Sequence, residues 1–282
     1  MSARPKARRR LGVKGKLSLG ALVACLLVGF VGPWLAPFKP TAIQGLAYQG
    51  SSREFVLGLD YLGRDVLSRL LSGGRTALTL SAAAVAVGYV LGLMIGLTSA
   101  YLGGIGDQIM MRAVDVVLAF PGLIFILLFV TALGSSKMLL VLAVGLSAGP
   151  RIARIVRGAA LEVMDLPFVE AARARGESPI YIATREVLPN ILSSISVDFG
   201  IRLATTILLV AGVSFLGFGL QPPVADWGLM VSENRAGITV QPWPVVAPAA
   251  MVGILTLSIN LLIDDWRAGA TGRVGVAALA ER

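Results

Sequence analysis

Side chains that usually carry chemistry are scarce in this sequence. It contains no histidine and a single cysteine, Cys25, so the usual metal ligands, general bases and thiol nucleophiles are almost absent. It also lacks a phosphate-binding loop of the form GxxxxGK[ST], because its only Gly-Lys pair, Gly15 and Lys16, is followed by Leu17. We therefore predict that the chain is not an enzyme and binds no metal or cofactor, and that a partner handles any ATP.

Two small groups of charged residues have spacings that allow specific contacts. Asp60, Arg64 and Asp65 lie within six residues, where they could contact an incoming protein or form a local salt-bridged turn; the sequence leaves both alternatives open. Asp198 and Arg202 are four residues apart, which puts them on one face of a helix. We interpret them as a neutralised ion pair near the cytoplasmic end of an apolar span.

The composition indicates whether water or lipid surrounds the elements that carry these residues. Of the 282 residues, 56% are hydrophobic and 15% are charged, against about 25% charged in a typical soluble domain. The net charge of +9 comes from basic segments beside apolar runs, without the aromatic-interleaved patch of a nucleic-acid surface. We predict an all-α, multi-pass membrane protein in contact with lipid, and no binding of nucleic acid.

The apolar runs are long enough for six membrane-spanning helices, since a span takes about 20 residues. The second run carries Gly88, Gly92 and Gly96 at four-residue intervals, a pattern typical of close helix packing in membranes. The predicted spans are 17–37, 76–102, 113–134, 138–156, 197–219 and 244–263. No pair of interrupted half-helices is evident in these runs.

The basic N-terminus predicts the orientation of the chain. Residues 1–16 carry seven cations and no acid, which the positive-inside rule assigns to the cytoplasm. A cleaved signal peptide is the alternative, but the run from Leu17 to Leu35 is longer than a usual signal core, so we favour a retained helix. With six spans, 38–75 is extracytoplasmic, 76–263 is the transmembrane core, and the tail 264–282 returns to the cytoplasm.

The predicted cytoplasmic loop 157–190 resembles two short helices joined at a glycine. Asp165 precedes Pro167 and can cap the first helix, and Gly176 can end it in a left-handed conformation. Ser178 can cap a second helix, which the ring of Pro189 should end. The apolar face of this loop needs a cover, either the membrane core or another protein.

The same loop, EAARARGESPIYIATREVLPN, resembles the EAA motif of the permease subunits of ABC importers. That resemblance implies a coupling helix that docks in a groove of a cytoplasmic ATPase. The coupling residues it implies are Glu170, Ala171, Ala172, Gly176, Leu188 and Pro189.

A second stretch, GLDYLGRDVLSRLLSGGRTAL, resembles the LGRD signature of dipeptide, oligopeptide and nickel permeases. A third stretch, SFLGFGLQPPVADWGLMVSENR from Ser214 to Arg235, resembles the fifth span and outer loop of the same permeases. The long N-terminal extension and the six spans are similar to the second, C-type permease of the pair. The resemblance implies that Asp60, Gly63, Arg64 and Asp65 lie outside, near the pore entrance or a receptor.

Together these resemblances imply the translocation subunit of an ABC importer in the inner membrane. Its partners would be a homologous second permease, two cytoplasmic ABC ATPases that hold ATP and Mg²⁺, and an extracytoplasmic substrate-binding protein. We expect dipeptides or oligopeptides as solutes, with nickel, a metallophore or glutathione as alternatives. A secondary transporter, which needs no ATPase, is the rival from another class.

Overall fold

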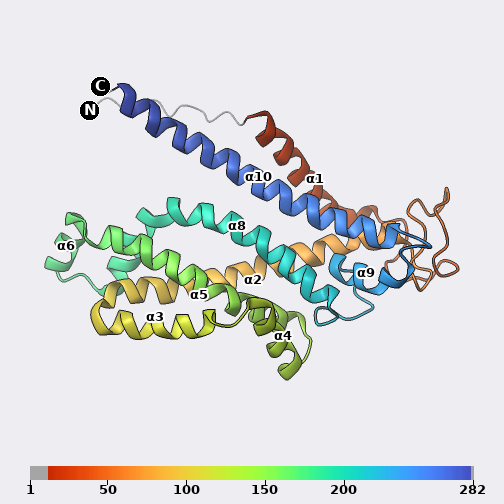
Figure 1. Ribbon diagram of the computed structural model, residues 1–282, viewed down its shortest axis with the longest axis horizontal. Helices are drawn as coiled ribbons and strands as arrows, with labels where there is room; N and C mark the ends of the chain where they lie inside the picture. Colours follow the sequence, from red (N-terminus) through yellow and green to blue (C-terminus); the bar gives the residue numbers. More distant parts are fainter. Residues whose placement is uncertain (1–11, 281–282) are drawn as a thin grey trace.

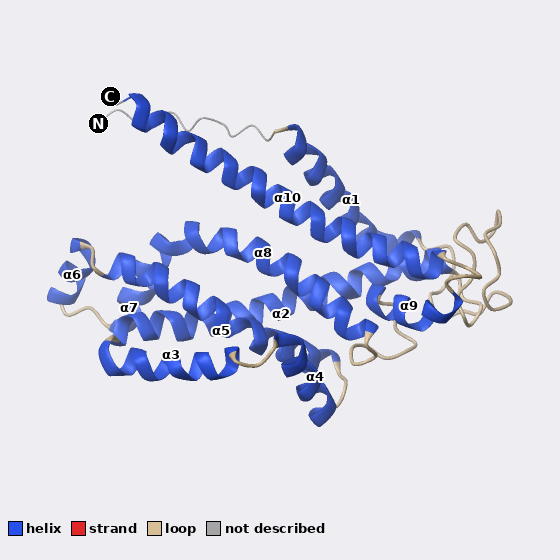
Figure 2. Ribbon diagram, in the orientation of Figure 1, coloured by secondary structure: helices blue, strands red, loops and turns tan. Residues whose placement is uncertain are grey.

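The computed structural model describes the backbone of residues 12–280 and the side chains as far as Trp266. The five cations between Arg4 and Arg10 therefore lie outside the described residues. Within them the chain is built of helices and loops, without a named strand (Figure 2). The helices are α1 (Val13–Leu35), α2 (Val66–Leu102), α3 (Gly104–Leu118), α4 (Gly122–Leu133), α5 (Lys137–Met164), α6 (Pro167–Ala174), α7 (Pro179–Tyr181), α8 (Leu188–Phe215), α9 (Trp227–Asn234) and α10 (Trp243–Ala280).

Five helical stretches are long and apolar enough to cross a membrane, and α3 with α4 forms a sixth candidate. In Figure 1, α2, α5 and α8 run along the length of the molecule, and α1 lies beside α10. The helix α6 lies at one end and α9 at the other; we call these the α6 end and the α9 end. The prediction of an all-helical protein with about six spans is confirmed.

The third predicted span, 113–134, is wrong as a single helix. Helices α3 and α4 are bent by 81° at a short break. Pro121, at the break, has no N–H to donate and disfavours helical geometry in Phe120. The sequence therefore does contain an interrupted helix pair, which a continuous apolar run had hidden.

The helix α2 begins ten residues earlier than predicted, because Asp65 caps it. The Ser68 N–H donates to Asp65 Oδ2 over 2.8 Å, which satisfies one of the free donors of the first turn. The predicted outer segment 38–75 therefore contains the first helical turns of α2. At the other end of the chain, α10 runs past the predicted limit of 263 into the tail.

Helices α2 and α5 pack closely through the predicted glycines. A Cβ atom placed on Gly96 would lie 2.7 Å from Ala153 O, and one placed on Gly92 would lie 2.5 Å from Ile152 Cγ2. Neither position has room for a side chain. The prediction of a small-residue packing face on this helix is confirmed.

Candidate functional site

The loop after α5 adopts the predicted turns, with one different cap. Helix α6 starts with Pro167 in its first turn, but its N-cap residue is Leu166 and not Asp165. Gly176 has φ +76°, a conformation that glycine adopts without steric cost. Ser178 caps α7 and accepts a hydrogen bond from the Tyr181 N–H over 3.2 Å. The two short helices are thus joined at Gly176, as predicted.

We predicted that the second of these helices ends at Pro189, and this prediction is wrong. Residues Ile182–Val187 form a π-helical turn that leads directly into α8. In this wider turn the Leu188 N–H donates to Ala183 O, five residues back. A proline ring clashes with the carbonyl four residues before it in a regular helix, and a π-type turn is one way in which helices relieve such a conflict. The loop is therefore continuous with α8.

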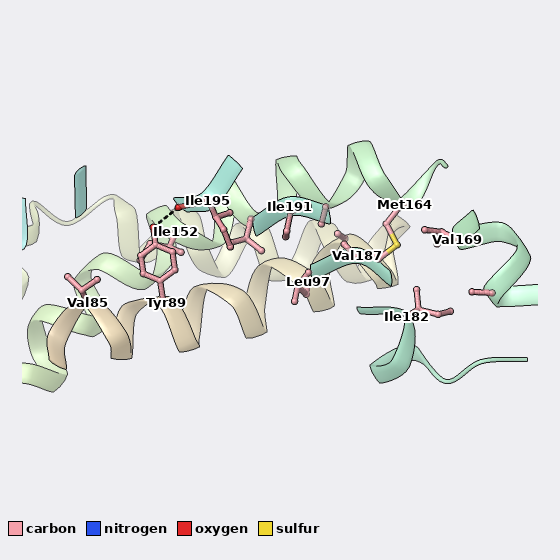
Figure 3. Packing of buried hydrophobic residues seen from close by; sticks show 14 residues of the cluster. Val85, Tyr89, Leu97, Ile152, Met164, Val169, Ile182, Val187, Ile191 and Ile195 are labelled. Atoms are coloured by element: carbon pink, nitrogen blue, oxygen red, sulfur yellow. Dashed lines mark hydrogen bonds between the residues drawn. The ribbon is translucent and has the colours of Figure 1, made fainter. Parts of the chain in front are cut away.

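The loop is fixed to the membrane core by its buried side. Val169, Ala172, Ile182 and Val187 are fully buried, and they belong to one apolar cluster with residues of α2, α5 and α8 (Figure 3). The other members of that cluster include Val85, Tyr89, Leu97, Ile152, Met164, Ile191 and Ile195. A displacement of the loop must therefore displace the long helices as well, because close-packed interiors transmit strain.

The predicted coupling residues divide between two faces. Ala172 points into the core, and Leu188 is half-buried, whereas Glu170, Ala171, Gly176 and Pro189 are exposed. The predicted docking of this loop on an ATPase stays a prediction.

Beside the coupling residues, the loop also exposes three apolar side chains, Phe168, Ile180 and Tyr181. Ile180 has 76% of its surface accessible. The loop thus offers charged and apolar groups to a second protein.

At the α9 end, the acidic and basic residues of the LGRD stretch join a buried ion network. Arg64 Nε lies 2.7 Å from Asp60 Oδ2, and Arg69 Nη1 lies 3.2 Å from the same oxygen. Arg64 Nη2 and Arg69 Nη2 lie 3.3 and 2.6 Å from Glu233 Oε2. Each of these four side chains is at most 6% exposed, and their formal charges sum to zero.

Of the two alternatives for Asp60, Arg64 and Asp65, the structure contains the salt-bridged turn. Asp65 caps α2, and Gly63 has φ +75° in the turn between Asp60 and Arg64. All four predicted residues are buried, so a receptor would meet their neighbours first. The receptor contact itself stays a prediction.

Burial changes the titration of Glu233, a member of this network, and of Tyr61 and Asp226. Desolvation, and then the neighbouring Glu233 carboxylate, raises the pKa of Tyr61, whose hydroxyl donates to Glu233 over 3.0 Å. Desolvation also raises the pKa of Glu233, opposed by Arg64. The pKa of Asp226 is raised by its complete burial, although it accepts the Leu229 N–H over 3.1 Å as the cap of α9.

The sequence analysis missed Arg69 and Glu233. Arg69 falls four residues after Asp65 and begins the second turn of α2, so a helix start at residue 66 would have put it on the helix. Glu233 is 164 residues further along the chain, and no local pattern connects it to Arg69.

The predicted pairing of Asp198 with Arg202 is confirmed, but its position is not. Arg202 Nε lies 3.2 Å from each Asp198 carboxylate oxygen, and the Tyr89 hydroxyl donates to Asp198 Oδ2 over 2.9 Å. Because α8 begins at Leu188, the pair lies in the middle of that helix and not near its end.

Comparison with known proteins agrees with this architecture. Residues 88–266 match the family model of the binding-protein-dependent transport system inner membrane component. The chain is 38% identical over 219 residues to the glutathione transport system permease protein GsiD of Pectobacterium atrosepticum, covering 78% of this chain and 73% of that protein. It is 37% identical over 250 residues to the protein of the same name from Shigella sonnei, covering 87% and 82%.

Solved structures show the same fold at lower identity. A structure of the MetNI methionine ABC transporter in inward-facing conformations matches with a TM-score of 0.53 at 21% identity, over 71% of this chain and 96% of that one. An amino acid ABC transporter with histidines matches with a TM-score of 0.51, also at 21% identity, over 67% and 87%. The chain therefore belongs to the family of inner-membrane components of binding-protein-dependent transport systems, and it is a permease subunit of an ABC importer rather than an enzyme.

Proposed function

We propose that this permease moves peptide-like solutes inward, including glutathione and short peptides. Two relatives that align over most of both chains are named for glutathione transport. Glutathione is itself a modified tripeptide, so a pathway for it and one for dipeptides must accept the same carboxylate, ammonium and amide groups. The peptide-permease motifs around Asp60 and after Ser214 support the same solute class.

The proposed assembly contains a homologous second permease, two cytoplasmic ATPases that bind ATP and Mg²⁺, and an external binding protein. In it, both chain ends and the loop 157–190 face the cytoplasm, and the segment 38–75 faces outward. The basic residues of 1–16 support this orientation. The α9 end would then face the binding protein, and the α6 end the ATPases.

One observation carries the proposed coupling mechanism: the loop is bound to the core on one side and exposed on the other. Glu170 and Ile180 are exposed and available to an ATPase. Val169 and Val187, in the same loop, are fully buried against the helices of the core. ATP-driven closure of the ATPases would push the exposed side, and the buried side would pass the movement to α2, α5 and α8 as a rigid-body shift.

Reconstitution in liposomes tests this proposal. The permease pair, the ATPases and the binding protein are assembled, and binding-protein-stimulated ATP hydrolysis is measured with Glu170→Ala and Gly176→Pro. We expect both variants to lose stimulation, the first through a lost contact and the second through a broken turn. Glu162→Ala, which removes an exposed acid at the end of α5, is the matched control and should behave like the wild type.

The same liposomes identify the solute. Uptake of glutathione and of a dipeptide supports the proposed class, whereas uptake of a nickel chelate alone would assign the chain to the metal branch of the family. Normal hydrolysis and ATPase binding in both loop variants would remove the loop from the mechanism.

A further inference from the structure

Helix α5 carries three arginines on one face, and two of them are neutralised by α3. Arg154 forms an ion pair with Asp115, and Arg157 forms one with Asp107. Because α3 runs beside α5, its two acids, Asp107 and Asp115, each lie next to one of these arginines. Arg151 is the third, one turn nearer the α9 end.

Arg151 lies where α3 has already ended. Its guanidinium is beside the first residue of α4: a Cβ atom on Gly122 would be 3.6 Å from Arg151 Nη1. Among the described residues, no acid lies within ion-pair distance of it. The break between α3 and α4 thus leaves one guanidinium without a carboxylate.

Arg151 lines a cavity of about 350 Å³ between α4, α5 and α8. A second guanidinium, that of Arg202, lines the same cavity, and Asp198 is its ion-pair partner. The cavity therefore has two cations and one adjacent anion. Its volume is within the range of small-molecule sites in proteins.

Three hydroxyl groups also line the cavity, beside the apolar side chains of Leu123, Ala148 and Leu209. Ser147 Oγ donates to Val144 O over 2.9 Å, and Thr205 Oγ1 donates to Ile201 O over 3.0 Å. Since the protons of these hydroxyls are used within their own helices, their lone pairs remain for N–H groups of a ligand. A ligand with a carboxylate at one end and N–H groups beside it would match the cavity.

The cavity also lies about midway along α5 and α8. With a rise of 1.5 Å per residue, Arg151 is ~21 Å along α5 from Lys137, and Arg202 is ~21 Å along α8 from Leu188. Arginines at such a depth are costly unless they face a cavity or a partner, and they mark solute pathways in membrane proteins.

We infer that this cavity binds the carboxylate of the transported solute on its way through the permease, with Arg151 as the main anion-binding residue. The inference rests on the proposed function, because a peptide import pathway supplies such a carboxylate. The headgroup of an anionic lipid has related chemistry, and the test below separates the two sources.

Charged thiol reagents test the site without requiring transport. In a Cys25→Ser background, which removes the only cysteine of this chain, Thr205→Cys places a thiol in the cavity. The assembled complex, with cysteine-free partners, is held in zwitterionic lipid nanodiscs. Labelling rates are measured with anionic and cationic methanethiosulfonates, each normalised to its rate with a free thiol. Thr98→Cys, exposed on α2 in a groove lined without acids or bases, is the control position.

We expect the anionic reagent to be favoured by about tenfold at Thr205→Cys relative to Thr98→Cys, since charge-lined clefts concentrate opposite charges by at least this factor. Arg151→Gln should abolish the preference and Arg151→Lys should restore it. Arg235→Gln, an exposed arginine at the α9 end, should leave it unchanged. Glutathione and trialanine should slow labelling, and trialanine amide should not.

Three outcomes would overturn the inference: equal rates for both reagents, a preference that survives Arg151→Gln, or equal protection by trialanine and its amide. Slowing by anionic lipid in the nanodiscs, without protection by the free-acid peptides, would assign the site to a lipid headgroup and would also overturn it. Binding-protein-stimulated ATP hydrolysis of the same complex tests the proposed function separately. Normal hydrolysis with no charge preference would reject this inference alone.

Discussion

Substitution of Gly96 by alanine should separate α2 from α5. The new Cβ atom would lie 2.7 Å from Ala153 O and 2.8 Å from Val156 Cβ, whereas ordinary contact begins near 3.4 Å. One neighbour is main chain and the other is a Cβ atom, so neither can rotate away. The helices must move apart by several tenths of an ångström, and overpacking of this kind costs ~1–3 kcal/mol.

Alanine also gains stability over glycine in a helix, by ~0.5–1 kcal/mol. The net destabilisation expected for Gly96→Ala is therefore about 0–2.5 kcal/mol, and large single domains lose ~2–4 °C of Tm per kcal/mol. Thermal unfolding of the purified permease in detergent, followed by size-exclusion chromatography with fluorescence detection, measures the shift.

Gly158→Ala is the matched control, because Gly158 is an exposed glycine of α5 whose Cβ position has nothing within 4 Å. It should keep or slightly raise the unfolding temperature. If Gly96→Ala were as stable as Gly158→Ala, close packing would not be the reason for glycine at this position.

Three further predictions concern charged groups. Arg69→Met should destabilise the protein by ~3–5 kcal/mol because it leaves two buried carboxylates with one cation, and adding Glu233→Gln should recover part of the loss in a double-mutant cycle of unfolding temperatures; additive losses would contradict the network. The pKa of Asp226 is raised by burial from 3.8, so its ionisation destabilises the fold as the pH rises from 3.8 through the raised pKa. The free energy of unfolding of Asp226→Asn should therefore rise relative to that of the wild type as the pH increases over that interval. A constant difference at all pH values would refute the assignment. Asp198→Asn should leave Arg202 without its carboxylate and increase the anionic labelling preference at Thr205→Cys several-fold; a decrease would mean that the cavity does not sense Arg202.

Local rules account for what could be predicted from the sequence. Long apolar runs predict helices in lipid. The small residues at Gly88, Gly92 and Gly96 predict a close-packed face, and the left-handed turn at Gly176 and the cap at Ser178 follow from the chemistry of single residues. Each depends on neighbours within a few positions, so it could be stated without knowing where any helix lies.

The contacts between distant groups depend on the tertiary structure. It brought Glu233 to Arg69, buried the LGRD turn, and ended α3 one turn before it could supply an acid to Arg151. It also continued the helix through Pro189, because a π-helical turn accommodated a ring that a regular helix would not. Pairing of charges across more than a hundred residues depends on helix lengths, breaks and rotations, and a change of one turn moves a side chain by about 5.4 Å, which is enough to make or remove an ion pair.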